Sequence, residues 1–384
     1  MAAWALDLSG CSVGPFQLDM DFFEALLRIK SCSYLGTCRI SFCEESPFAA
    51  PLVLLLEQEG IRLEFDSASQ MLIRIVLSNL RSVSLSYQGT IISGPRCETT
   101  LDVIYSVLPR TVLGRLDREG GIYELPYSSA SFLFKIPTEY QDLYEGMNFA
   151  VCTPDGESPQ CVGIVMKVGE DKNTQLKRVQ LIPGRGVIIE GERGLYLGDS
   201  VQSCVSLLGA PDRHYFPQGT QQKIHQSEQH NEEDKQQTSL PLHVVIPTKK
   251  EHSCGVEVLK EACRERNNSP DFYYNYFRLG LDLLFDETLA LKRIVAHTSI
   301  PGHADFGCYR KCAFYAEIGD KTVTDLSIRE ELASFGGGAL PAPVVSARSR
   351  GSQNQETTFF FGFQSGIAFE VTPTEHIASV MLFT

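Results

Sequence analysis

Reactive side chains cluster in the segment 301–312, which contains His303, Asp305, Cys308 and Cys312. A cysteine hydrolase needs a thiolate, a histidine base and a polar group that orients the base, and all three are present here. No flanking motif of a cysteine hydrolase accompanies them. Metal binding would need the histidine and both cysteines to converge with a fourth ligand. We interpret the segment as a structural turn with core thiols. The alternative is a cysteine-dependent hydrolase centred on His303 and Cys308.

A second candidate is aromatic, because five of the six residues 272–277 are Phe or Tyr. If one strand continued from here to Asp286, alternate residues would face opposite sides. One side would be core and would carry Phe277, Leu279, Leu281, Leu283 and Phe285. The other side would carry Tyr274, Tyr276 and Arg278, and these residue types are enriched at protein interfaces. We interpret these three as a candidate protein interface. The alternative is that a neighbouring helix or a polar insert covers them.

Other patterns predict no catalytic residue, no cofactor site and no metal site. Tyr140–Leu143 has the aromatic-x-x-aliphatic form of short autophagy-receptor ligands. Four-residue matches are common by chance, and such a ligand needs an exposed, extended backbone. The sequence therefore leaves the role of this segment open.

Composition excludes several classes of function. The chain has 384 residues, 43% apolar and 21% charged, with a formal charge of −13. An acidic chain is poorly suited to nucleic acid or to anionic lipid, both of which attract basic surfaces. The N-terminus lacks the basic and apolar regions of a signal peptide, and no two of the 12 cysteines have C-x-x-C spacing. We therefore expect a cytoplasmic protein with reduced cysteines.

Four short helices are indicated by start and stop signals, beginning near Asp19, Thr99, Asp199 and Ser327. The last has a capping-box pattern from Ser327 to Glu330. Each helix is followed by segments of alternating apolar and polar residues, which are typical of hairpins with one buried face. These are 60–66 with 72–77, 121–125 with 131–136, 280–286 with 291–298, and 366–372 with 377–383.

These elements predict an α+β fold made of four degenerate helix-plus-antiparallel-hairpin units, packed as a composite. We expect units one and two in residues 1–140, a β-rich connecting segment in 141–194, and units three and four in 195–384. Residues 218–269 are rich in Gln, Glu, Lys, Asn and His. Such a composition predicts a flexible polar insert.

Several longer stretches together resemble one family. They are Asp271–Asp286, His297–Phe306, Phe359–Gln364 and Glu375–Val380, with Gly14–Phe16, Gly60–Asp66, Tyr196–Pro211 and Lys223–His225 in support. In combination they are similar to the phagosome assembly factor 1 family. The similarity is stronger from about residue 195 to the end than between about 87 and 190.

The resemblance implies a non-enzymatic autophagy regulator. It implies a complex with a β-propeller partner, the breast carcinoma amplified sequence 3 protein, at the phagophore assembly site. The membrane would then be reached through the partner. No catalytic residues are carried over, because the family offers none.

Overall fold

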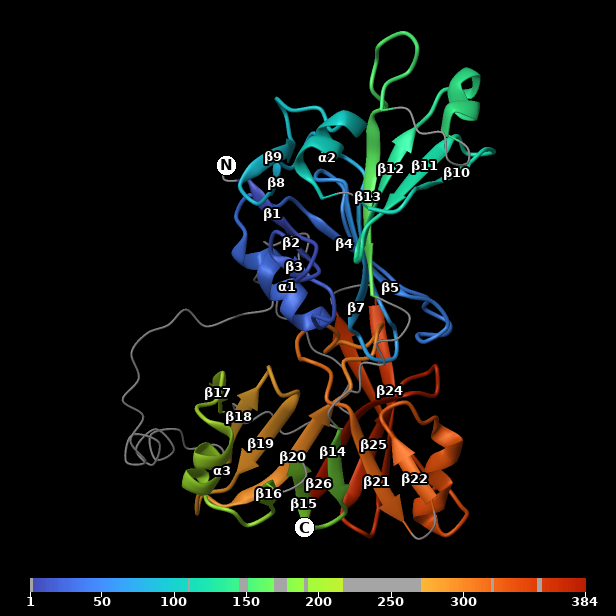
Figure 1. Cartoon of the computed structure of the whole chain (residues 1–384). Coiled ribbons are helices and arrows are strands. Elements are labelled where there is room, and N and C mark those ends of the chain that lie inside the picture. Colours follow the sequence, from blue (N-terminus) through green and yellow to red (C-terminus); the bar gives the residue numbers. More distant parts are fainter. Residues whose placement is uncertain are drawn as a thin grey trace, which may run out of the picture. The chain divides into compact units, whose positions relative to one another are not determined.

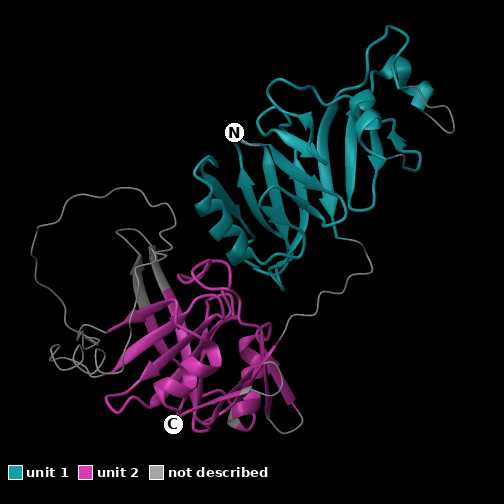
Figure 2. Cartoon of the chain, turned by 60° about the vertical axis from the view of Figure 1, so that its left-hand side comes forward, with its two compact units in different colours: residues 1–176 teal, residues 177–384 magenta. Residues whose placement is uncertain are grey.

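The computed structural model describes residues 3–109, 111–144, 151–168, 178–189, 193–216, 271–318, 321–350 and 354–384. The chain divides into two compact units, residues 1–176 and 177–384 (Figure 2). The division falls inside the expected connecting segment 141–194. The expected insert 218–269 lies outside the described residues.

Two sheets build the described part of unit 1 (Figure 1). The small sheet has the order β3 (Phe16–Gln17), β2 (Ser12–Val13), β1 (Trp4–Asp7), β8 (Leu85–Tyr87) and β9 (Thr90–Ser93). The large sheet has the order β10 (Arg115–Asp117), β11 (Ile122–Pro126), β12 (Ala130–Lys135), β13 (Cys161–Lys167), β7 (Leu72–Leu77), β6 (Ile61–Phe65), β5 (Leu52–Leu56) and β4 (Cys38–Ser41). The large sheet is antiparallel throughout, whereas β1 and β8 pair in parallel.

The described part of unit 2 repeats this strand order. Its small sheet runs β16 (Arg193–Tyr196), β15 (Gly186–Ile189), β14 (Val179–Ile182), β21 (Phe314–Ile318) and β22 (Lys321–Thr324). Its large sheet runs β17 (Arg213–Tyr215), β18 (Phe272–Tyr276), β19 (Leu281–Phe285), β20 (Leu291–His297), β26 (Ile377–Phe383), β25 (Ile367–Val371), β24 (Asn354–Phe363) and β23 (Val344–Arg350). The parallel pair is again in the small sheet, between β14 and β21.

Five short helices lie among the described residues: α1 (Phe22–Ser31), α2 (Leu101–Val107), η1 (Thr138–Tyr144), α3 (Val201–Leu208) and η2 (Arg329–Gly336). The residue before α1 forms a β-bridge with the loop after a hairpin strand, and so do the residues before α2, α3 and η2. These bridges are Asp21–Met71, Thr100–Gln160, Ser200–Ala290 and Ile328–His376. The bridges pin each helix start to a hairpin of its own unit.

Helix starts differ from the prediction by one or two residues. Asp21, rather than Asp19, caps α1 by accepting from the Glu24 N–H at 2.9 Å. Ser200, rather than Asp199, caps α3 by accepting from the Ser203 N–H at 3.2 Å. The predicted capping box at Ser327 is wrong, because Ile328 is the N-cap residue of η2 and makes no side-chain cap bond.

The core of unit 2 lies between its two sheets. Leu181 and Phe314 of the small sheet join Leu283 and Phe369 of the large sheet in one buried cluster, to which Cys204 of α3 also belongs. The predicted α+β class is confirmed. The finer prediction of four equivalent units stays a prediction.

Candidate functional site

The predicted interface residues do not share one exposed face. Tyr274 and Tyr276 are only 2% and 3% exposed and belong to the hydrophobic core of unit 2. The Tyr276 hydroxyl donates to the Gly209 carbonyl at the end of α3, at 3.1 Å. Only Arg278 stays exposed, beside Asp212 at 3.8 Å. The structure therefore corrects the prediction for the two tyrosines, and Arg278 alone remains a candidate contact.

A turn explains the correction. Residues 272–276 and 281–285 are two strands of a hairpin, in which Tyr274 lies opposite Leu283 and Tyr276 lies opposite Leu281. The reversal at 277–280 puts the tyrosines on the same face as these leucines. Gly280 makes the turn possible, because it has φ +69° and a Cβ there would lie 2.3 Å from the Arg310 carbonyl oxygen.

His303 is committed to structural contacts. It is 3% exposed, and its Nδ1 accepts from the Asp305 backbone N–H at 3.3 Å. Its Nε2 lies 3.4 Å from Glu370 Oε1. The Glu370 carboxylate also accepts from the hydroxyls of Thr358 and Ser379, at 2.9 and 2.7 Å. This geometry gives His303 the task of joining the segment 298–313 to the large sheet, and the hydrolase alternative is not favoured.

A second polar group lies on the same sheet face, around Asp282. His297 Nε2 lies 3.0 Å from Asp282 Oδ2, and the Tyr309 hydroxyl donates to the same oxygen at 2.8 Å. Asn275 Nδ2 donates to Asp282 Oδ1 at 2.7 Å. The rings of His297 and Tyr309 are stacked, with centroids 3.9 Å apart. Burial and then the Asp282 charge raise the pKa of Tyr309, so its hydroxyl stays a donor.

Cysteine chemistry is disfavoured by burial. The Cys312 thiol is buried, and burial raises its pKa to about 12. A thiol with such a pKa is a poor nucleophile near neutral pH. Among the described residues, no group of three or more His, Cys, Asp or Glu side chains could hold a metal ion.

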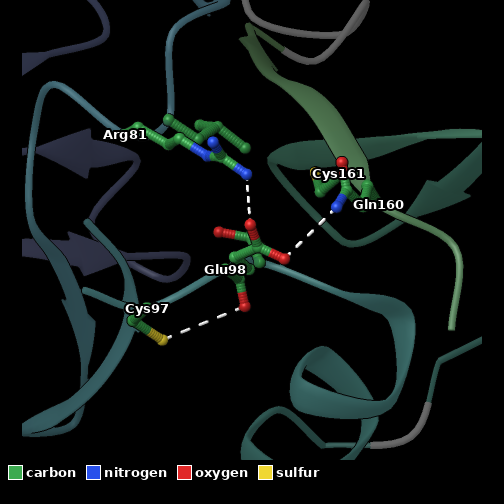
Figure 3. Close-up of a pocket in the computed structure, with 7 residues that line it drawn as sticks. Arg81, Cys97, Glu98, Gln160 and Cys161 are labelled. Carbon is green, nitrogen blue, oxygen red and sulfur yellow. Dashed lines mark hydrogen bonds and ion pairs between the residues drawn. The ribbon is translucent and has the colours of Figure 1, made fainter. Parts of the chain in front are cut away.

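A small pocket in unit 1 is filled by an ion pair (Figure 3). Its volume is about 40 Å³, and Arg81 forms an ion pair with Glu98 inside it. Gln160 Nε2 donates to the second Glu98 oxygen at 3.2 Å. The carboxylate is thus shared between two partners from different segments. We interpret this pocket as a structural junction, since it holds little more than one water.

A larger cleft of about 460 Å³ opens elsewhere in unit 1. It is lined by four separate segments: residues 5–9 at the end of β1, Tyr87 and Gln88, Pro109 after α2, and Tyr127 and Ser128 between β11 and β12. The Ser129 hydroxyl donates to the Leu8 carbonyl at 2.6 Å, which fixes two of these segments together. Neither the sequence motifs nor the resemblance indicated this cleft, because its residues come from distant positions.

The segment Tyr140–Leu143 lies within η1 and is helical. An extended receptor ligand would need a different backbone at this position. No helix in the described part of the chain combines the length and apolarity that a membrane crossing requires.

Comparison with known proteins decides the family. The sequence model described as phagosome assembly factor 1 matches residues 12–184 and 248–383, which is most of the chain. The chain belongs to the phagosome assembly factor 1 family. The predicted family resemblance is thereby confirmed.

Relatives from three kingdoms or phyla align over nearly the whole chain. A PHAF1 protein of Arabidopsis thaliana is 28% identical over 418 aligned residues, covering 100% of this chain and 94% of the relative. A PHAF1 protein of Caenorhabditis elegans is 28% identical and covers 96% of this chain and 90% of its own length. A PHAF1 protein of Drosophila melanogaster is 25% identical, with coverages of 97% and 92%. No solved structure matches the chain.

The two stretches matched to the phagosome assembly factor 1 family fall in both units. They include the polar network around Asp282 and Glu370, and the cleft residues Tyr87, Pro109 and Tyr127. The cleft segment 5–9 precedes the first matched residue. The family therefore shares the framework of the cleft, whereas the β1 side of it lies outside the match.

Proposed function

We propose that this protein is a non-enzymatic adaptor that acts in autophagy, in the assembly of the phagosome. It works in a complex with a β-propeller protein of the breast carcinoma amplified sequence 3 type. It is cytoplasmic and is recruited to the phagophore assembly site, where the partner contacts the membrane. The observation that carries the proposal is the match to the phagosome assembly factor 1 family across both units.

The use of the polar side chains supports an adaptor over an enzyme. His303, Asp282 and Glu370 hold a loop against a sheet, and each is bonded to neighbouring side chains or backbone. A catalytic centre would instead direct a nucleophile and a base toward a shared open site. Here the buried polar groups stabilise packing, which leaves the surface for recognition.

The surface offers apolar contacts of the kind that partners cover. Val112 and Leu113 are 69% and 52% exposed, and Val344 and Val345 are 67% and 59% exposed. Val344 and Val345 lie in β23, at the edge of the large sheet of unit 2. Neighbouring exposed apolar residues are typical of protein interaction sites. The acidic net charge of −13 also favours reaching an anionic membrane through a partner.

Native affinity purification tests the proposal. The tagged full-length chain is recovered from its own cells before and after autophagy is induced, and bound proteins are identified by mass spectrometry. We expect a β-propeller protein at near-stoichiometric amounts, and we expect the tagged chain at phagophore sites by microscopy. Recovery of neither a propeller protein nor any autophagy component would overturn the proposal.

A matched variant separates the adaptor from the hydrolase. Cys308→Ser removes the candidate nucleophile of the alternative while preserving the size of the side chain. We expect this variant to recover the propeller partner as well as the unmodified chain does. Loss of function with normal folding and normal partner recovery would favour the hydrolase.

A further inference from the structure

We propose that the cleft in unit 1 binds an arginine side chain presented by an extended segment of a partner protein. The proposal rests on the proposed function for the existence of a partner. The cleft itself provides the chemistry, through two tyrosine rings, one unpaired hydroxyl and one ionised carboxylate.

The two rings that line the cleft are Tyr87 and Tyr127. They are near neighbours, because the pKa of Tyr127 is raised to about 12 by burial and then by the charge that Tyr87 would carry. Tyrosine faces attract cations, and the flat guanidinium group stacks on them better than an ammonium does. The Thr111 hydroxyl donates to the Pro126 carbonyl at 2.6 Å, so exposed Val112 and Leu113 follow directly from a residue anchored beside Tyr127. Partner residues next to the arginine therefore meet an apolar rim.

The hydroxyl of Tyr127 is the unexplained polar atom of the cleft. It is buried and has no hydrogen-bond partner among the described residues. A buried hydroxyl without a partner is costly, and such groups in native structures are usually satisfied by something. A guanidinium N–H can donate to this oxygen, and a peptide carbonyl can accept its proton. An extended peptide carrying arginine offers both groups.

Asp7 supplies the charge. Its Oδ1 accepts from the Ser9 N–H at 3.0 Å, the Ser9 hydroxyl at 2.7 Å and the Gly10 N–H at 2.8 Å. These bonds, the Gly10 N–H first, hold the pKa of Asp7 below its usual value. All three bonds end on Oδ1, which leaves Oδ2 to accept from a ligand. No lysine or arginine lines the cleft in the part of the chain that the structure describes, so the ligand has to bring the positive charge.

Methyl NMR of the full-length protein tests this inference. The probe is a capped tetrapeptide, acetyl-Ala-Leu-Arg-Ala-amide, and the reference probe has citrulline in place of arginine. Citrulline has nearly the same shape but no charge. We expect the arginine peptide to shift the methyl signals of Leu6 and Leu8 and to bind at least about fivefold more tightly than the citrulline peptide.

Variants locate the interaction. Asp7→Asn keeps an acceptor oxygen for the Ser9–Gly10 turn and removes the charge, so we expect about fivefold weaker binding of the arginine peptide and unchanged binding of the citrulline peptide. Tyr127→Phe should fold normally, because its hydroxyl has no partner to lose, and it should weaken both peptides. The control is Asp286→Asn in unit 2, because Asp286 also accepts three bonds on Oδ1, from Thr288 N–H, Thr288 hydroxyl and Ala290 N–H. It should change neither affinity.

The outcomes separate the cleft from the adaptor role. Equal affinity for the two peptides, or no shift of the Leu6 and Leu8 methyls, would overturn the inference. If partner recovery then remains intact in the affinity purification, the proposed function stands without the cleft. If the arginine peptide binds but no propeller protein or autophagy component is recovered, the proposed function fails and the cleft stands.

Discussion

His297 and Asp282 join two neighbouring strands on the face of the large sheet of unit 2 that points away from the hydrophobic core. Their Nε2 and Oδ2 atoms lie 3.0 Å apart, on β20 and β19. The Tyr309 ring stacks on His297 and bonds to the same carboxylate oxygen. One buried carboxylate thereby connects two strands of the sheet to the segment that crosses it.

Asp282→Ala should destabilise the protein. The substitution leaves the donors of Asn275, His297 and Tyr309 without their shared acceptor, so we expect the free energy of unfolding to fall by about 3 kcal/mol. Tyr309→Phe removes only one of these donors and should cost about 1 kcal/mol. Urea unfolding monitored by circular dichroism measures both. Equal effects of the two variants would contradict the central role of Asp282.

Tyr274→Ala should lower the free energy of unfolding by about 3–5 kcal/mol, because it empties a ring-sized volume in the core of unit 2. Arg278→Ala is the matched control on the same hairpin. Its side chain is 67% exposed, and the change should stay within about 0.5 kcal/mol. Chemical denaturation of both variants checks the difference. A mild effect of Tyr274→Ala would show that the ring is not core.

Thiol reactivity should follow burial. At pH 8, exposed Cys152 should be alkylated first, and Cys312 should react roughly 1000-fold more slowly, because its pKa is raised from 9.0 to about 12 and the thiol is buried. Timed iodoacetamide labelling followed by peptide mass spectrometry measures each site. Labelling of Cys308 faster than that of Cys152 would indicate an activated thiol and would revive the hydrolase.

His376 should make stability depend on pH. Burial lowers the pKa of His376 below its usual value of 6.5, so the unfolded chain takes up the proton first as the pH falls. The contribution is complete above pH 6.5 and is lost as the pH drops toward the lower pKa of the folded state. His376→Gln should therefore flatten the rise of unfolding free energy with pH between roughly 5 and 6.5. Parallel urea titrations across this range compare the two proteins, and identical slopes would contradict the assignment.

Local patterns determined much of the fold. The alternation in residues 60–66 and 72–77 predicted the hairpin of β6 and β7, and the same signal located β25 and β26. Alternation works because one face of each strand is buried in its own unit, so the burial period of two is written in the chain. The family, too, followed from stretches of sequence, because such stretches need no tertiary information.

Only the tertiary structure decided which face of residues 272–276 is core. The sequence pattern treated 272–286 as one strand, and the turn at Gly280 reversed the face on which Tyr274 and Tyr276 lie. Cleft residues such as Asp7, Tyr87 and Tyr127 are far apart along the chain, and nothing local links them. Contacts of this kind arise from the packing of whole sheets, so they depend on the sum of many residues and leave no signature at any one of them.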